Sequence, residues 1–435
     1  MRVAVVGAGP AGIYAAEALA TDHNVEVDVF DTLPVPCGLV RYGVAPDHFS
    51  IRSVRDKLVE TLDHSKVRFF GNVTIGTDIL AEELTSIYDA VIYTYGASQD
   101  RALGIEGEDS DSCFAATEFV KWYTGHPDAQ DFSGQLARAQ DVVVIGLGNV
   151  AVDVTRVLIK PILEMNETDM PEHVLKALRN STVRRVHVVG RRGPHHATFT
   201  TKELKELGEL EGVSVNIMAS DLPNNDAEAS DGNRVVERNL KVVRDWAERD
   251  SVDTPKAINF RFYSTPLAYS EQDSELIVER MTVLPDGAIQ PSGELERIPA
   301  DLVIRSVGYK GAHLPGVPFD SAKSVIPSVD GKIIGAERSY VAGWIKRGPS
   351  GIIGTNKKDA VATVATLVAD LFEQPSGAQA PDYVVSLLKD RGIEYVDVSG
   401  WKRIDAAERE LGSLSGKDRT TIHERKTLLA LAKEN

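Results

Sequence analysis

Two glycine-rich segments of this chain have the residue types and spacing that hold the diphosphate of a dinucleotide. Residues 7–12 read GAGPAG after the apolar run 3–6, and residues 146–151 read GLGNVA after the apolar run 142–145. In such segments the first glycine permits a tight turn, the second lets the backbone approach the pyrophosphate, and the third allows close helix–strand packing. Two dinucleotide sites in one chain indicate hydride transfer between the bound groups. The pair therefore predicts a flavoprotein that is reduced by a nicotinamide cofactor.

The residues that end the next strand of each motif predict two different nucleotides. After the first motif, the predicted strand 25–30 (VEVDVF) ends at Asp31, whose carboxylate can accept hydrogen bonds from two ribose hydroxyls. After the second motif, the run 185–190 ends at Arg191 and Arg192. A carboxylate there would repel a 2′-phosphate, whereas two guanidinium groups bind it through charge-assisted hydrogen bonds. The alternative for the arginines is a solvated turn.

The apolar runs place both motifs in α/β domains. A strand over 2–6 leads into a helix from Pro10 to about Leu19, and the strand over 301–305 ends the second nucleotide domain. We expect two doubly wound, Rossmann-like domains, with the second nucleotide-binding domain (102–309) inserted in the first (1–101 and 310–435). The family resemblance described below implies that the inserted domain binds NADP and the outer one FAD. In the first domain we also expect short strands at 67–70 and 90–93, a linker at 375–381 and a helical C-terminal portion. In the second domain we expect an extended helix with a polar insertion over 155–182 and a loop at 222–232.

Composition excludes several classes of protein. The net charge of −16 argues against a nucleic-acid binder, and 435 residues are too many for one ordinary core. Cys37 and Cys113 are the only cysteines and form no CxxC, which excludes a vicinal dithiol, a multi-cysteine zinc site and a chain-borne iron–sulfur cluster. We expect no metal site, no membrane span and no signal peptide, and we expect a cytoplasmic monomer.

Six sequence blocks resemble one family of flavoenzymes. They are residues 38–48 (GLVRYGVAPDH), 148–153, 189–194 (VGRRGP), 199–204 (FTTKEL), 305–309 (RSVGY) and 343–356 (GWIKRGPSGIIGTN). In this order they resemble adrenodoxin reductase and the bacterial ferredoxin–NADP⁺ reductases of the adrenodoxin-reductase type. The resemblance runs from residue 1 to about 370, and the last 60 or so residues are much less diagnostic.

The resemblance implies FAD at the first motif and NADP(H) at the second. The FAD contacts are then Gly7, Gly9, Pro10, Ala11, Gly12, Asp31, Leu39, Val73, Trp344, Gly351, Ile352 and Ile353. The NADP contacts are Gly148, Asn149, Val150, Arg191, Arg192, Glu203 and Gly351, the last being close to the nicotinamide. Many relatives have Glu at the Asp31 position and another residue at Cys37, which puts local packing at Cys37 in doubt.

The block 343–356 also has a physical interpretation of its own. Gly348, Gly351 and Gly354 leave backbone N–H groups free to approach a flat ring, and a helix beginning near Lys357 adds its positive dipole end. The alternative is an ordinary loop before a helix.

Two titratable residues are candidates for tuning the nicotinamide pocket in the implied family. Hydride transfer needs alignment rather than a general acid or base, so His48 and Glu206 are candidates for tuning the pocket only. His48 is alternatively a hydrogen-bonded turn residue, and Glu206 a solvated helix residue.

The resemblance implies that NADPH reduces FAD by hydride transfer and that the flavin passes single electrons to a ferredoxin. The alternatives are a two-electron NADPH oxidoreductase, such as the flavin subunit of a larger complex like glutamate synthase, and a non-catalytic FAD/NADP sensor.

An acidic iron–sulfur partner requires a basic docking surface on this acidic chain. One candidate is a helix over 234–249, with Val236, Leu240, Val243 and Ala247 on one side and Arg234, Arg238, Lys241 and Arg244 on the other. The alternative there is a solvated helix face that also carries Asp245 and Glu248. Lys346, Arg347, Lys357 and Lys358 are the next candidates.

Overall fold

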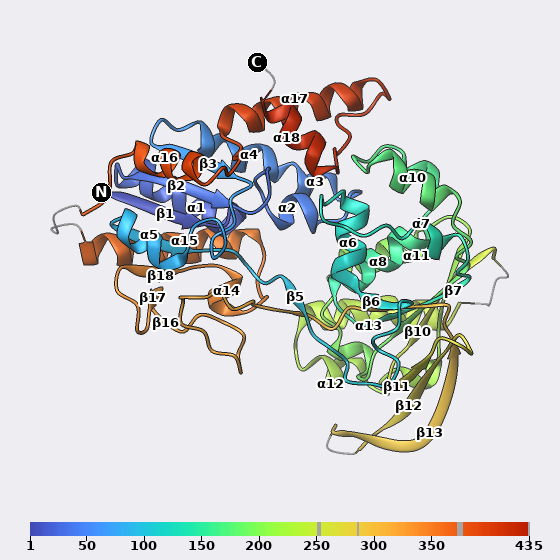
Figure 1. The fold of residues 1–435 in the computed structure, drawn as a ribbon. Coiled ribbons are helices and arrows are strands. Elements are labelled where there is room, and N and C mark those ends of the chain that lie inside the picture. Colours follow the sequence, from blue (N-terminus) through green and yellow to red (C-terminus); the bar gives the residue numbers. More distant parts are fainter. Residues whose placement is uncertain (250–253, 285–286, 372–376, 434–435) are drawn as a thin grey trace. The chain divides into compact units, whose positions relative to one another are not determined.

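The computed structural model describes residues 1–249, 254–284, 287–371 and 377–433 (Figure 1). The chain forms two compact units: the first contains Met1–Arg101, Thr124–Asp128 and Gly308–Asn435, and the second contains Ala102–Tyr123 and Ala129–Val307. Both units are built on parallel β-sheets, so the predicted fold class, two Rossmann-like α/β domains with the second inserted in the first, is confirmed. None of the helices in the described part of the chain has the length and apolar character that crossing a bilayer requires.

The first unit is organised around a seven-stranded sheet. Its order is β16 (Ser328–Val329), β17 (Lys332–Ile333), β18 (Ser339–Val341), β4 (Ala90–Tyr93), β1 (Arg2–Val6), β2 (Glu26–Asp31) and β3 (Val67–Gly71). The strands from β18 to β3 pair in parallel. Strand β18 returns after the whole second unit and pairs with β4, with Ser339 opposite Val91.

Alternating side chains of this sheet form two cores. Val3 and Val5 of β1 face one core, whose helices are α1 (Pro10–Glu17), α15 (Ile353–Leu371), α17 (Val398–Ser413) and α18 (Arg425–Lys433). Ala4 and Val6 face the other core, against α5 (Ala81–Ile87) and α16 (Asp382–Asp390). The period-two pattern thus buries both faces of the sheet, as is typical of parallel strands between helical layers.

The second unit has a six-stranded parallel sheet. Its order is β6 (Cys113–Ala115), β14 (Leu302–Arg305), β7 (Asp141–Ile145), β8 (Arg185–Val189), β10 (Lys256–Arg261) and β9 (Val213–Ile217). One face packs against helices that include α6 (Ala116–Thr124), α8 (Asn149–Ile159), α11 (Thr201–Gly208) and α13 (Arg234–Ala247). The opposite face packs against an antiparallel sheet of β11 (Ser264–Ser270), β12 (Glu275–Val283) and β13 (Ile289–Pro299). No local pattern in the sequence predicted this second sheet.

Two expectations for the second unit are wrong. The expected long helix ends at Ile159 because Pro161 cannot continue it, and the chain then forms α9 (Ile162–Met165) and α10 (Glu172–Arg179). The expected loop at 222–232 contains α12 (Asp226–Ser230), whose start is fixed by the Asn225 side chain, which accepts from the Glu228 N–H at 3.5 Å.

The predicted linker at 375–381 lies partly outside the described residues, namely at 375–376. Its described part is tied to the first unit, because the N–H groups of Gly377 and Ala378 donate to Asp89 Oδ1 at 2.8 and 3.1 Å. The chain then enters the predicted helical C-terminal portion, which comprises α16, α17 and α18.

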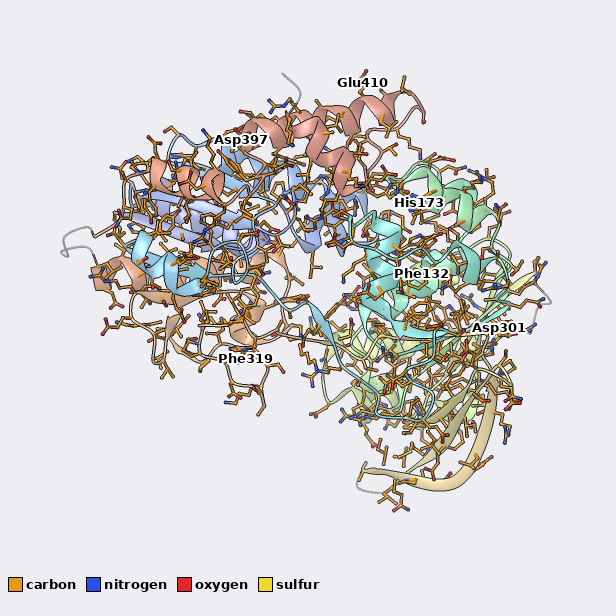
Figure 2. All side chains as sticks on the ribbon, viewed as in Figure 1. Phe132, His173, Asp301, Phe319, Asp397 and Glu410 are labelled. Carbon is orange, nitrogen blue, oxygen red and sulfur yellow. The ribbon has the colours of Figure 1, made fainter. Side chains whose placement is uncertain are left out.

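A buried ion cluster joins the C-terminal helices to the start of the chain. Glu408 on α17 accepts from Arg41, on α2 (Leu39–Tyr42), and from Arg419, each with a distance of 3.1 Å to Oε2. The Ile422 N–H also donates to Glu408 at 2.9 Å, and all three charged side chains are buried. Figure 2 shows Asp397 and Glu410 near the two ends of α17. The C-terminal portion is therefore an integral part of the first unit.

We expect Glu408→Gln to lower the free energy of unfolding by about 3 kcal/mol, because it leaves Arg41 buried without its negative partner, whereas Arg419 keeps Asp405 at 2.7 Å. Chemical denaturation followed by circular dichroism measures the change. Glu410→Gln is the matched control on the same helix, since Glu410 is exposed; we expect it to stay within about 0.5 kcal/mol. Equal effects of the two substitutions would show that the buried cluster contributes nothing specific.

Candidate functional site

The first glycine motif connects β1 to α1 and leaves one side of the turn open. Gly7 has a φ of +108°, and a Cβ on Gly12 would lie 1.9 Å from the Gly7 carbonyl oxygen, so neither position tolerates a side chain. A Cβ on Gly9 would meet no atom within 4 Å, and Gly9 caps α1 without any side-chain hydrogen bond. The first N–H groups of α1 therefore face open space at the positive end of the helix, which fits a pyrophosphate.

Asp31 lies at the carboxyl end of β2, beside this motif. Its Oδ2 accepts from the Ala8 N–H at 2.7 Å and its Oδ1 from the Leu33 N–H at 2.8 Å. A carboxylate has about four acceptor positions, so two remain for ribose hydroxyls. Burial raises the pKa of Asp31 to about 6, against the lowering effect of the two backbone hydrogen bonds and of Arg425. The Val73 N–H donates to the Asp31 carbonyl at 2.9 Å, so the structure brings these two predicted FAD contacts together.

Residues 37–39 lie against the same turn. The Cys37 N–H donates to the Ala8 carbonyl at 2.8 Å, and a Cβ on Gly38 would lie 3.1 Å from the Cα of Gly9. Leu39 follows at the start of α2 and is exposed. Cys37 is buried at a φ of +85°, and burial raises the pKa of its thiol to about 12, so this cysteine is a packing residue rather than a reactive one.

The closing block is held against the first motif. Gly343 has a φ of +79°, and a Cβ there would lie 2.7 Å from the Cβ of Ala11 on α1. The next residue, Trp344, begins α14 (Trp344–Arg347), and its indole Nε1 is buried without a partner in the described part of the chain. An unsatisfied indole donor beside the motif fits a bound ring system with acceptor atoms.

The glycines of the closing block differ in conformation. Gly348 and Gly351 have φ values of +80° and +87°, as the predicted backbone approach requires. The following helix, α15, begins at Ile353 rather than near Lys357, so Gly354 belongs to its first turn. The side chain of Ile352 is 78% exposed, and with Gly351 and Ile353 it stays a predicted flavin contact of the first unit.

His48 lies in the first unit, at the start of the short helix α3 (Phe49–Arg52). Its N–H donates to the Ala45 carbonyl at 3.0 Å, and its own carbonyl accepts from Ile51 and Arg52. These bonds make it a turn residue, and its predicted tuning role stays a prediction.

We expect the affinity of the apoprotein for FAD to rise with pH through about 6. The unliganded carboxyl of Asp31 has a raised pKa, and ribose hydroxyls favour its ionised form, so protonation competes with binding. Flavin fluorescence titrations should show affinity about ten-fold lower at pH 5 than at pH 7.5. Asp31→Asn should bind FAD weakly at both pH values; if the variant keeps the full pH dependence, another group titrates.

The second glycine motif repeats this geometry between β7 and α8. Gly146 has a φ of +143°, and a Cβ there would lie 2.2 Å from the Ser306 carbonyl oxygen. Gly148 caps α8 without a side-chain hydrogen bond, and a Cβ there would meet only the Thr198 hydroxyl, at 3.4 Å. Asn149 begins the helix, and its Oδ1 accepts from the Thr200 N–H at 2.8 Å; Val150 follows it. The open turn fits a second pyrophosphate.

The predicted recognition residues of the second motif lie at the ends of β8 and α11. Arg191 and Arg192 follow β8 and are exposed, and the described residues provide no ion-pair partner for either guanidinium. Glu203 is in the first turn of α11, where Thr200 caps its N–H at 3.4 Å, and its Oε2 is buried without a described partner. Unpaired arginines are the feature expected around a 2′-phosphate. An unsatisfied carboxylate oxygen fits a neighbouring ribose hydroxyl, which can donate to it.

Glu206 lies one turn after Glu203 and is engaged within the protein. Its carboxylate lies 3.6 Å from Arg156 Nη1 and 3.9 Å from Lys202 Nζ, and Arg156 also pairs with Asp153 at 2.8 Å. Its predicted role in the nicotinamide pocket stays a prediction.

Two features of these sites escaped the sequence analysis. Thr94, directly after β4, donates from its hydroxyl toward the carbonyls of Val6 and Gly7, both at 2.9 Å, and so supports the first turn. His195 and His196 follow the two arginines and lie in contact with each other. Two adjacent histidines that follow the paired arginines so closely in the sequence could have been predicted to line the same site.

Several known proteins that are similar to this chain are nucleotide-dependent oxidoreductases. Residues 1–219 match the family model described as pyridine nucleotide-disulphide oxidoreductase. The chain is 41% identical over 440 residues to the NADPH-ferredoxin reductase FprA of Mycobacterium tuberculosis, covering 97% of this chain and 96% of that protein. It is 35% identical over 451 residues to the mitochondrial NADPH:adrenodoxin oxidoreductase of Bos taurus, covering 99% and 92%. The structure of M. tuberculosis FprA in complex with NADPH superposes with a TM-score of 0.94 at 40% identity, covering 100% and 99% of the two chains.

Proposed function

Because this chain belongs to the pyridine nucleotide-disulphide oxidoreductase family, and within it to the NADPH-ferredoxin and adrenodoxin reductases, we propose that it is an FAD-dependent NADPH–ferredoxin reductase. The contrast between the two motifs carries the proposal. At the first motif the carboxylate of Asp31 lies beside the open turn, which supports binding of free ribose hydroxyls. At the second, Arg191 and Arg192 are exposed at the end of the strand, which supports binding of a 2′-phosphate.

The residues of each unit fit one of the two nucleotides. When bound, FAD supplies a ring that accepts a hydride and releases electrons singly. The turn at Gly9, the carboxylate of Asp31 and the unpartnered indole N–H of Trp344 hold and orient it. In the second unit, the open turn at Gly148 and the two arginines hold NADP(H). None of these residues needs to transfer a proton, because hydride transfer depends on alignment and on the exclusion of water.

Three acceptors test the proposal. NADPH oxidation with ferricyanide requires only a bound, reducible flavin, whereas cytochrome c reduction that depends on added ferredoxin requires single-electron delivery to an iron–sulfur protein. We expect both activities. Ferricyanide activity without ferredoxin-dependent activity would indicate a two-electron oxidoreductase, and the loss of both would indicate a binding protein without turnover.

We expect the double substitution Arg191→Ala/Arg192→Ala to lower kcat/KM for NADPH by at least about a hundred-fold while NADH efficiency changes little. Each lost charge-assisted contact to the 2′-phosphate costs about 1.5–3 kcal/mol, and NADH has no such phosphate. Steady-state kinetics with ferricyanide measure both values. An equal decline for the two cofactors would mean that the arginines are structural.

The docking surface for ferredoxin is a separate proposal. Several of the basic residues suggested for it by the sequence are paired with carboxylates in the structure. Arg244 of α13 is held by Asp226, with contacts of 2.6 and 3.0 Å, and its charge is neutralised. Lys346 and Arg347 are similarly paired with Asp359.

Several candidate cations keep their charge free. Arg234, Arg238 and Lys241 on α13 are exposed, and no ion pair to them is found among the described residues. Lys358 on α15 is likewise exposed and unpaired there. We therefore favour the exposed face of α13 as part of the docking surface for an acidic ferredoxin.

We expect Arg238→Glu/Lys241→Glu to raise the KM for ferredoxin about ten-fold at low salt, because the reversal removes electrostatic steering. The difference should shrink as salt approaches 0.1 M, where the Debye length is about 10 Å. Lys176→Glu/Arg184→Glu is the control, since both residues are exposed elsewhere on the second unit. If the KM of the native protein for ferredoxin does not change with salt, electrostatic steering is absent. If it changes with salt but not with the substitutions on α13, the docking surface lies elsewhere.

The compartment and the oligomeric state complete the proposal. Cys37 and Cys113 are both free and buried, which supports a reducing compartment such as the cytoplasm. The expected monomer stays a prediction, which light scattering on the purified holoprotein tests.

A further inference from the structure

A pair of histidines, His195 and His196, follows the two arginines of the second unit after Gly193 and Pro194. Pro194–His196 form a single 3-10 turn, and the rings of His195 and His196 lie with their centroids 4.1 Å apart at an angle of 48°. The Nδ1 atom of His195 is buried, and no partner for it is found among the described residues.

The backbone fixes this pair beside Arg192. A Cβ on Gly193 would lie 2.0 Å from the hydroxyl of Tyr263, so the chain here packs closely against that side chain. The Tyr263 N–H also donates to the Arg192 carbonyl at 3.3 Å, and the His196 N–H closes the turn on the Gly193 carbonyl at 3.0 Å. The two imidazoles are therefore held within one turn of the arginines by contacts that need no ligand.

The charges around the pair are mainly positive. Burial lowers the pKa of His195, and the neighbouring His196 lowers it further. Burial and then Arg192 lower the pKa of His196. Helix α13, which packs against this turn, carries Arg234, Glu237, Arg238 and Lys241 in its first half. Three of these four are basic, so the charge that α13 brings to this turn is net positive.

We propose that His195 and His196 complete the 2′-phosphate site of this chain, donate ring N–H groups to the phosphate beside Arg191 and Arg192, and take up a proton when it binds. This inference rests on the proposed function, in which the second unit binds NADP(H). It adds two specificity residues, and it makes the preference for a 2′-phosphorylated nucleotide depend on pH.

The sign of the pH dependence follows from linkage. A nucleotide phosphate monoester loses its second proton near pH 6, so at pH 7 the ligand already carries about two negative charges. A dianion beside an imidazole favours the imidazolium form, so binding raises the proton affinity of the pair. Affinity for the phosphorylated nucleotide therefore falls as pH rises above 7, whereas a nucleotide without the 2′-phosphate shows no such fall.

Titration calorimetry on the holoprotein tests the proposal with adenosine 2′,5′-bisphosphate and 5′-AMP as probes. Measurements at pH 7 in two buffers of different ionisation enthalpy give the number of protons exchanged. We expect proton uptake with the bisphosphate and none with 5′-AMP. His195→Gln/His196→Gln should abolish the uptake and weaken bisphosphate binding roughly ten-fold, with 5′-AMP binding unchanged. His23→Gln, at an exposed position of the first unit, is the control.

The outcomes separate this proposal from the one on which it rests. If the native protein does not prefer the bisphosphate to 5′-AMP, the second unit does not recognise a 2′-phosphate and the proposed NADP site itself fails. If the preference is present but the double glutamine variant keeps both the affinity and the proton uptake, the NADP site stands and the histidine proposal is overturned. Unchanged 5′-AMP binding by the variant shows that the second unit is still folded.

Discussion

The close approach of backbone to backbone at each glycine motif is the constraint on which both sites depend. A methyl group at Gly12 would lie 1.9 Å from the Gly7 carbonyl oxygen, and one at Gly146 would lie 2.2 Å from the Ser306 carbonyl oxygen. Because no side chain fits at Gly12, the first turn of α1 stays against the turn that follows β1, and because none fits at Gly146, the turn before α8 stays against the end of β14. In both units the free N–H groups of the helix lie at the carboxyl edge of the sheet. Everything that distinguishes one nucleotide from the other lies at that edge.

The two units share this frame and differ in the charges placed around it. The first presents a buried carboxylate that is already held by the backbone N–H groups of Ala8 and Leu33. The second presents guanidinium groups without partners among the described residues and, three positions after Arg192, a pair of imidazoles. A satisfied anion suits neutral hydroxyls, because it needs only weak donors, whereas unpaired cations suit a phosphate. The electrostatic state of each unliganded site thus matches the ligand proposed for it.

Local sequence patterns predicted the elements that such patterns control. The strands at 2–6, 142–145 and 185–190 were predictable because buried parallel strands are continuous apolar runs, and Asp31 and Arg191 follow from their positions at strand ends. Pro161 was an equally local signal for the end of α8 that was not used. The alternation of Leu276 and Val278 in β12 is shorter and weaker, so the three-stranded sheet was missed. The pairing of Arg244 with Asp226 joins two helices and cannot be read from either segment alone.

The ion pair between Arg41 and Glu408 has a consequence for how the chain acquires its structure during synthesis. The two residues are 367 positions apart, and β18 as well as the helices of the C-terminal portion are needed to close the cores on both faces of the first sheet. At a translation rate of about 5–20 residues per second, β1 and β2 wait on the order of tens of seconds for these partners. The second unit, whose strands all lie between Cys113 and Arg305, emerges complete in the meantime. During synthesis we therefore expect the second unit to fold while the apolar strands of the first unit are still exposed. In that interval we expect this chain to depend most on chaperones.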